Sequence, residues 1–151
     1  MLLLWGANNA RNGSAFPEEL LGINVNRKFE TLYVYQATFY GAPEQAPVYN
    51  LAFRYEDGSS STNPILYGLD VLDFYINKGP AELGPIGPRS KLVWLGQLPG
   101  GEKPQPLRFF TTAVKNPEPT RTVATIDLYS CKTTAAACIQ AMTTGPSGLM
   151  P

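Results

Sequence analysis

The sequence contains no histidine and only two cysteines among its 151 residues. Histidine is the side chain that most readily acts as a general base near neutral pH, so its absence excludes Ser-His-Asp and Cys-His catalytic arrangements. Two thiols without histidine cannot supply the four ligands of a tetrahedral zinc site. The commonest hydrolytic and zinc-dependent chemistries are therefore excluded at the outset.

Charge is also scarce. Charged residues make up 16% of the chain, and 12 basic residues balance 12 acidic ones, with no segment that gathers one sign. A nucleic-acid-binding protein normally carries a basic face that neutralises phosphates, and acidic glycans such as heparin also need basic clusters. The composition therefore argues against nucleic acid and against acidic glycans as partners.

Long apolar runs are missing as well. No stretch approaches the roughly 18 apolar residues of a transmembrane helix, so we expect no membrane insertion. The apolar start at residues 1–5 lacks a basic region and is shorter than the roughly 7–15 apolar residues of a signal peptide. We interpret it as a first β-strand, in a chain that is cut from something longer or starts at an introduced methionine.

What the sequence does contain is a repeated alternation of side chains. Leu32 and Val34 alternate with Tyr33 and Tyr35, which buries one face of a strand and leaves the other for solvent or a second layer. The same period of two recurs at residues 50–56, 107–112 and 123–129. Turns rich in the 14 glycines and 14 prolines separate these runs. The pattern predicts an all-β fold, an antiparallel β-sandwich of eight or nine short strands with very little helix.

The length is typical of one domain, which we place at residues 1–145, with 146–151 as a tail or linker. The only helix candidate is a short turn at residues 17–21. Residues 79–90 contain three prolines and cannot form a central strand, because proline lacks the N–H that a sheet ladder needs. We expect them to form a surface loop, either a simple crossover between sheets or a binding loop.

The two cysteines, Cys131 and Cys138, flank the connection between the expected strands 121–130 and 137–144. In a hairpin these positions could face each other at disulfide distance. Closing so short a loop would stabilise the fold by about 2.5 kcal/mol on the chain-entropy argument. A disulfide would indicate an oxidising compartment, and the alternative is a pair of free thiols.

Carboxylates remain as catalytic candidates, since a pair of them can hydrolyse glycosides. Asp70 and Asp73 are the nearest such pair. Their spacing in an extended strand would point them to opposite faces, so they can cooperate only if the chain turns there. The simpler interpretation is that one of these carboxylates lies in a turn or bulge and the other faces solvent. We therefore expect no enzyme activity.

Several short blocks of residues follow one another in an order that resembles a known family. They are Gly22–Phe29, Leu32–Ala37, Tyr55–Gly58, Tyr67–Tyr75, Trp94–Gly96, Arg108–Thr112, Asn116–Pro119 and Ile126–Leu128. Over roughly residues 20–144, this order resembles a bacterial β-sandwich domain appended to large secreted, surface and regulatory proteins. That domain is similar in turn to the galactose-binding-like jelly rolls, which include discoidin domains and many carbohydrate-binding modules.

The resemblance implies a jelly roll in an extracellular or cell-surface setting, with a binding or architectural role and no catalytic residues to carry over. We expect no cofactor, although a structural calcium ion held by carboxylates and loop carbonyls is possible because galactose-binding-like folds often keep one; no dense acidic cluster is present in this sequence. One departure concerns the segment after Asp73. Such domains usually have two tryptophans there, and this chain has Phe74 and Tyr75, which weakens that spot as a sugar platform.

Binding of a polysaccharide or glycan would use rings that stack on the apolar face of a sugar and polar groups that bond its hydroxyls. The candidate platforms are Tyr75, Trp94, Tyr67 and Tyr40, and the candidate hydroxyl partners are Asp73, Arg108 and Asn116. Aromatic residues of a sandwich are more often core. Trp94 in particular has apolar neighbours on both sides, which favours its burial.

Two functions therefore remain open. A carbohydrate-binding module predicts exposed aromatics clustered on one face or loop rim. A structural or interaction domain of a surface or regulatory assembly, self-association included, predicts buried aromatics with an apolar patch or an unpaired edge strand. The exposure of the tyrosines is the observation that separates them.

Overall fold

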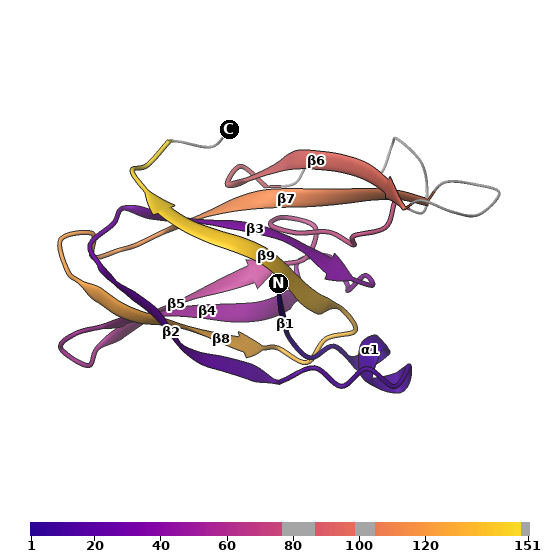
Figure 1. The fold of residues 1–151 in the computed structure, drawn as a ribbon, viewed down its shortest axis with the longest axis horizontal. Helices are drawn as coiled ribbons and strands as arrows, with labels where there is room; N and C mark the ends of the chain where they lie inside the picture. Colours follow the sequence, from indigo (N-terminus) through magenta and orange to yellow (C-terminus); the bar gives the residue numbers. More distant parts are fainter. Residues whose placement is uncertain (77–86, 99–104, 149–151) are drawn as a thin grey trace.

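The computed structural model describes residues 1–76, 87–98 and 105–148 as two antiparallel β-sheets packed face to face (Figure 1). The five-stranded sheet has the order β1 (Leu2–Leu3), β9 (Ala136–Gly145), β3 (Thr31–Phe39), β7 (Gln105–Lys115) and β6 (Ser90–Leu98). The four-stranded sheet has the order β2 (Glu19–Arg27), β8 (Val123–Ser130), β4 (Pro47–Tyr55) and β5 (Ser60–Leu66). The predicted all-β sandwich is confirmed.

The order of the strands is compatible with a jelly roll. If β6 is set aside, β1-β9-β3-β7 faces β2-β8-β4-β5, and the chain passes repeatedly from one sheet to the other. Such an arrangement corresponds to the double Greek key of jelly rolls. Strand β6 is then an addition to the edge of the five-stranded sheet, paired to β7 alone among the described strands.

The core follows from the alternation in the sequence. The inward faces of the two sheets contribute Leu32, Leu51, Phe53 and Phe110, all of them fully buried. Phe53 lies edge-on to the ring of Phe29, with 5.4 Å between their centroids. Burial of rings and branched side chains at about 25 cal/mol per Å² is the main force that holds the sheets together.

One polar chain crosses this core. The Tyr49 hydroxyl on β4 donates to Gln36 Oε1 on β3 at 2.5 Å, and Gln36 Nε2 donates to the Thr112 hydroxyl on β7 at 2.8 Å. The Ser90 hydroxyl on β6 donates to the same Thr112 oxygen at 2.8 Å. Burial strongly raises the pKa of Tyr49, so this phenol stays a neutral donor. The network fixes the register of the two sheets because every buried polar group in it has a partner.

Residues 72–76 form a wedge in the five-stranded sheet, at the end where β3 and β7 separate. The ladder between β3 and β7 ends at the pair Gln36 and Phe110. Beyond it, the Phe74 N–H donates to the carbonyl of Thr38 on β3 at 2.6 Å, and the Phe74 carbonyl accepts from Arg108 N on β7 at 3.0 Å. The wedge places Phe74 and Tyr75 in the sheet between two strands, instead of on a loop.

The start of the chain differs in part from expectation. Strand β1 is the expected first strand. The expected helical turn at residues 17–21 is wrong, because β2 begins at Glu19 and Leu20 pairs with Leu128 of β8. Helix α1 spans Ala7–Arg11 instead. The ladder with β8 and the packing of Leu20 on the core outweigh the local helical signal of Pro-Glu-Glu.

The expected disulfide is also wrong, since Cys131 and Cys138 are free thiols. Strands β8 and β9 do not form a hairpin, because β8 belongs to the four-stranded sheet and β9 to the five-stranded one. The connection crosses between layers, and Cys138 becomes an interior β9 residue paired with Leu3 and Ala37. The proximity in sequence therefore does not become proximity of the two sulfurs in a ladder.

Burial raises the pKa of the Cys138 thiol to about 11, and it raises the pKa of Cys131 as well. A neutral thiol is a poor nucleophile, so we expect Cys138 to react much more slowly with a thiol reagent at pH 8 than a free cysteine does. Two thiols per chain should react after denaturation. Because the folded pKa lies above the unfolded value, this thiol's contribution to stability is complete below about pH 9 and is lost as the pH rises towards 11.

The check is a time course of thiol titration on native and denatured protein prepared without reductant. Fewer than two reactive thiols in the denatured sample would mean that the cysteines are joined after all. Rapid reaction of both thiols in the native sample would contradict the burial of Cys138 in β9.

Candidate functional site

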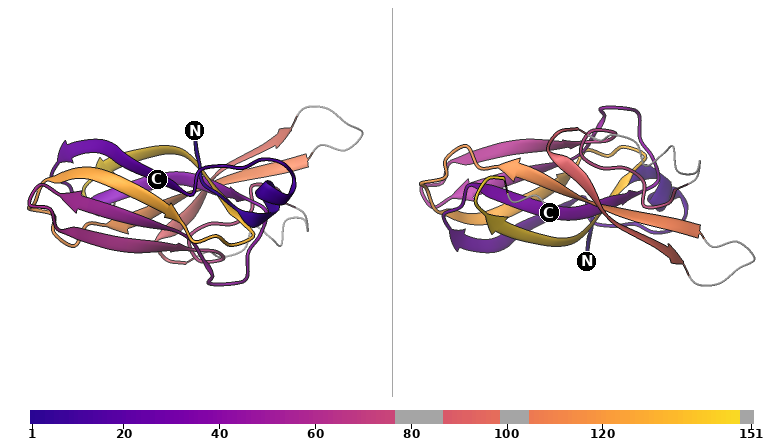
Figure 2. Two further views of the ribbon diagram at one scale, coloured as in Figure 1. Left: turned by 90° about the horizontal axis from the view of Figure 1, so that it is seen from below. Right: turned by 90° about the horizontal axis from the view of Figure 1, so that it is seen from above.

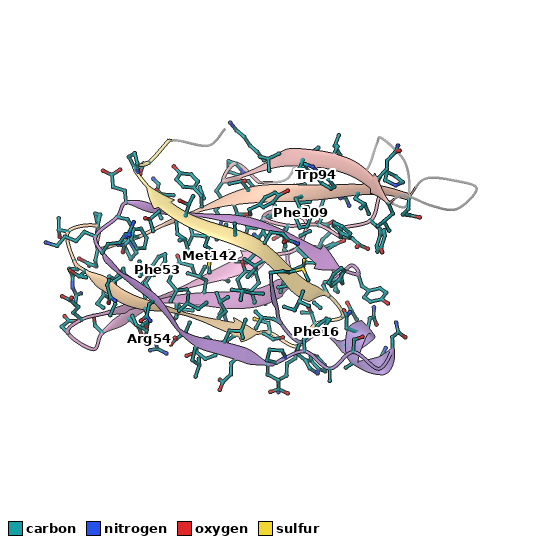
Figure 3. All side chains as sticks on the ribbon, in the orientation of Figure 1. Phe16, Phe53, Arg54, Trp94, Phe109 and Met142 are labelled. Atoms are coloured by element: carbon teal, nitrogen blue, oxygen red, sulfur yellow. The ribbon has the colours of Figure 1, made fainter. Side chains whose placement is uncertain are left out.

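The outer face of the five-stranded sheet contains a row of aromatic rings from three neighbouring strands. Trp94 on β6 lies opposite Phe109 on β7 (Figure 3). The centroids of the two rings are 5.7 Å apart. Tyr35 on β3 lies 4.9 Å from Phe109, and Phe74 of the wedge lies 5.0 Å from it. Phe109 is therefore the buried centre of the row, and Trp94 is its exposed end. We call Trp94 and Phe109 together the aromatic platform.

Trp94 is 41% exposed, so the burial favoured by its apolar neighbours is wrong. Those neighbours, Val93 and Leu95, are exposed too, because β6 is the last strand of its sheet and none of the described strands covers its apolar run. A continuous apolar run has the same appearance on an exposed edge as in a buried strand. The sequence alone does not separate these two cases.

The orientation of Trp94 depends on Gly96. The two residues lie on one face of β6, and a Cβ atom at Gly96 would overlap the six-membered ring of the indole. The ring therefore lies along the strand, over the space that a side chain at position 96 would fill. Phe109 supports it from the neighbouring strand at an interplanar angle of 55°. One ring face is thus held out towards solvent without the freedom of an unsupported tryptophan.

A groove of about 530 Å³ lies on the same outer face, on the far side of Tyr35 from the platform. It is lined by Tyr33, Tyr35, Thr111 and residues 141–145 of β9. Because Tyr35 contacts Phe109 and also lines the groove, the platform and the groove form one continuous surface. The groove offers the Tyr35 and Thr111 hydroxyls as hydrogen-bonding groups. Burial raises the pKa of Tyr35, so its phenol is neutral and can donate.

Five of the six predicted site residues lie at one end of the five-stranded sheet. Tyr75 contacts Phe74 at 5.4 Å between centroids and pairs with Leu107, so it is connected to the platform through the wedge. Asp73 lies next to Tyr75, and its Oδ1 accepts from Tyr75 N at 3.1 Å. Tyr75 is only half-buried, but its ring is part of the wedge and not an isolated surface platform.

The predicted hydroxyl partner Arg108 is only 3% exposed. Its Nε donates to the Asp73 carbonyl at 2.8 Å, and its guanidinium lies 5.6 Å from the ring centre of Phe110. Tyr67 lies close to Asp73 and Arg108. Burial is the largest cause of the raised pKa of Tyr67, and the effects of Asp73 and Arg108 are smaller. Arg108 and Tyr67 therefore brace the wedge from the inner side of the sheet, away from the platform.

Asn116 lies in a separate place, just beyond the other end of β7. Its Oδ1 accepts from the Tyr55 hydroxyl at 2.7 Å, and its Nδ2 donates to the Phe29 carbonyl at 3.0 Å. At about 3.3 Å per residue, the strand puts it more than 20 Å from Arg108. Asn116 is therefore a buried brace between β7 and the Phe29 turn and shares no surface with the platform.

The tyrosines by themselves fit the pattern expected of a structural or interaction domain, and the exposed aromatic that fits a binding module is Trp94. Seven of the eight are buried or half-buried, and only Tyr40, at 39%, is exposed. Tyr40 lies at the end of β3 and accepts a hydrogen bond from Asn12 Nδ2 at 2.6 Å. The exposed ring of the platform is a tryptophan. The residues that sequence reasoning missed are Phe109, Tyr35 and Gly96. Only Gly96 had a local signal, a glycine two positions after the aromatic Trp94.

The two aspartates have separate hydrogen-bond partners in the structure. Asp70 is buried and accepts from Arg89 through both oxygens, at 2.7 and 2.6 Å, whereas Asp73 caps its own turn. Within residues 1–76, 87–98 and 105–148, no three acidic or cysteine side chains gather closely enough to hold a metal ion. No helix in the described part of the chain is long and apolar enough to cross a membrane.

Comparison of the chain with known protein families, with curated proteins and with solved structures found no match. The fold class therefore rests on the structure itself. Any function has to be argued from the platform, the groove and the edge strand.

Proposed function

We propose that this chain is a non-catalytic carbohydrate-binding module of the galactose-binding-like kind, within a secreted or cell-surface protein, and that it binds a neutral glycan. The observation that supports this most strongly is the Trp94 ring, which lies over Gly96 and against Phe109 with one face open. Sugars present an apolar C–H face that stacks on such a ring. The free cysteines remove one argument for an oxidising compartment, so the extracellular setting depends on the sequence resemblance alone.

The groove supports the same proposal, because it continues the platform across the sheet. A glycan chain with one sugar on Trp94 would extend past Tyr35 into the groove, where the Tyr35 and Thr111 hydroxyls can bond sugar hydroxyls. An open groove on a sheet face accepts a segment of a chain, whereas a closed pocket would accept only a chain end. The proposed ligand is therefore a polysaccharide or an extended oligosaccharide.

The test is a glycan array with wild type, Trp94→Ala and Tyr40→Ala. Burying about 50 Å² of apolar surface on one ring contributes about 1.2 kcal/mol, so Trp94→Ala should weaken binding about tenfold. Tyr40→Ala removes an exposed ring outside the platform and should bind as the wild type does. Gly96→Ala keeps the tryptophan but displaces its ring, and it should lose affinity with a shift in tryptophan fluorescence.

Equal weakening in Tyr40→Ala would show that the array reports general stickiness and would overturn the site. Retention of full affinity in both Trp94→Ala and Gly96→Ala would overturn it as well. Thermal unfolding of each variant gives the control for fold, and we expect melting temperatures within a few degrees of the wild type.

A second function, an interaction domain, is favoured by the edge strand β6. Its free side has no partner strand among the described residues, and Val93, Trp94, Leu95 and Leu98 are all exposed. The ends of β6 and β7 next to residues 99–104 extend beyond the rest of the sandwich (Figure 2). Such an apolar edge is a template for pairing with another strand.

Leu95 separates the two functions, because it lies opposite Arg108, on the other face of β6 from Trp94, and is 53% exposed. Light scattering after size exclusion would detect an oligomer. If the edge pairs, Leu95→Lys should restore a monomer while glycan binding is kept. A wild-type monomer at all concentrations tested would remove self-association as the role of the edge.

A further inference from the structure

A second cavity, separate from the platform, lies at the opposite edge of the sandwich from β1 and β2. It measures about 560 Å³ and is lined by Thr31, Asn63, Pro88, Arg89, Lys91, Ala113, Lys115, Ser147 and Gly148. It exists because β6 begins at Ser90, opposite Thr112, whereas β7 continues to Lys115. The end of β7 that β6 does not cover, at Ala113 and Lys115, therefore lines the cavity together with Asn63 of β5 and Ser147.

Positive charge gathers here although the whole chain is neutral. Arg89 and Lys91 lie at the start of β6 and Lys115 at the end of β7, and none of the described lining residues is acidic. Arg89 is neutralised by Asp70, whose two oxygens hold its Nε and Nη2. The Pro64 carbonyl accepts from the same Nη2 at 2.7 Å. The guanidinium is thus fixed in position. Asp70 and Pro64 use its Nε and Nη2 donors and do not use those of Nη1.

Asn63 supplies the second and independent observation. Its Nδ2 atom is buried and has no hydrogen-bond acceptor among the described residues. Asn63 pairs with Leu51 in the ladder of β4 and β5, so its side chain points between the sheets, as Leu51 does. A buried amide that donates to nothing costs about 1–3 kcal/mol. A half-turn of the side-chain amide would bring Nδ2 from its buried place to the open side of Asn63, where an acceptor in the cavity would remove that cost.

The polar groups that line the cavity are mostly donors. They are the Asn63 amide, the Lys115 ammonium, the fixed guanidinium of Arg89 and the hydroxyls of Thr31 and Ser147, which lie 3.2 Å apart. Ser147 is held in place because its N–H donates to Glu30 Oε2 at 2.8 Å. Donors of this kind recognise an anionic oxygen. Pro88 and Ala113 add an apolar wall, and the volume is in the range of small-molecule sites.

The balanced composition argued against acidic glycans as partners, but the fold gathers these cations at one place. We propose that this cavity binds a sugar carboxylate, namely a hexuronate. The carboxylate would lie against Lys115 and, after the half-turn of the amide, against Asn63 Nδ2, and the C–H face of the ring would lie against Pro88. A monoanion fits better than phosphate, because one of the cations is already balanced by Asp70. Trp94 does not line the cavity, so this site does not depend on the carbohydrate platform.

The test is titration of the protein with sodium glucuronate, with glucose and sodium acetate as probes at matched ionic strength. Glucuronate should bind and glucose should not, because glucose lacks the carboxylate. Lys115→Met and Asn63→Leu should each weaken glucuronate binding about fivefold, the value for one charge-assisted or previously unmet hydrogen bond. Trp94→Ala should leave it unchanged, which keeps this result distinct from the glycan test.

Two controls make the result decisive. Lys28→Met removes an exposed lysine outside the cavity, and weakening by this variant as large as by Lys115→Met would reduce the effect to general charge and overturn the site. Asn63→Leu removes an unsatisfied buried donor and should not lower the melting temperature, so its loss of binding cannot be ascribed to unfolding. Acetate binding as tight as glucuronate would overturn the sugar acid as the ligand, and glucose binding as tight would overturn the role of the anion.

Discussion

Replacing Arg89 with methionine should lower the melting temperature by about 10 °C. The Asp70 side chain is 2% exposed, and its carboxylate depends on the Arg89 guanidinium, 2.6 Å away, for compensation of its charge. Removal of one partner of a buried pair leaves an uncompensated charge and costs about 3–5 kcal/mol. In a domain of this size each kcal/mol corresponds to roughly 2–4 °C. Because Arg89 is 36% exposed, we take the lower end of the range.

The double variant Asp70→Asn with Arg89→Met makes the test specific. The asparagine oxygen can still accept the Leu66 N–H that now bonds Asp70 Oδ2 at 2.8 Å, but it has no charge to compensate. The double variant should therefore be more stable than Arg89→Met alone, a sign of coupling that a double-mutant cycle measures. If the changes in unfolding free energy of the two single variants simply add in the double variant, Asp70 and Arg89 are not energetically coupled. In that case the cost of Arg89→Met comes from lost packing.

The period-two pattern was enough to predict the sandwich, because burial of one face of each strand is a property of the local sequence. Leu32, Leu51 and Phe53 all occupy the core positions that their alternation indicates. Whether two consecutive strands share a sheet is not a local property. Cys131 and Cys138 were predicted as a hairpin pair, and the crossing from β8 to β9 between sheets separates them.

The candidate site was predicted in part for a similar reason. Motif reasoning found Trp94, and it found Asp73 and Tyr75, which lie in the wedge that contacts the platform through Phe74. It assigned Arg108 to ligand binding because arginine is polar, but period two places it on the inner face of β7, next to Phe110. The anion cavity could not be predicted at all. Its cations and Asn63 meet only because β7 continues to Lys115, beyond Thr112, which pairs with the first residue of β6. That is a matter of register between distant segments.

Replacing Phe110 with alanine should destabilise the fold by about 4 kcal/mol, the middle of the range for a fully buried phenylalanine. Phe110 is fully buried on the central strand β7, pairs with Gln36 on one side and Leu92 on the other, and lies beneath Arg108. Its loss opens a cavity between the sheets and removes the ring face that supports a buried guanidinium. Chemical denaturation should show the loss as a lower midpoint with an unchanged slope.

Phe110→Leu is the matched control, since it keeps most of the volume and should cost less than half as much. Equal losses in both variants would mean that the ring contact with Arg108, and not the cavity, decides the stability. Phe109→Ala, one residue earlier, removes a ring on the opposite face of the same strand. It should weaken glycan binding by leaving Trp94 unsupported, whereas Phe110→Ala should bind glycan normally wherever it is folded. That difference between neighbouring residues follows from a strand with one face in the core and the other on the binding surface.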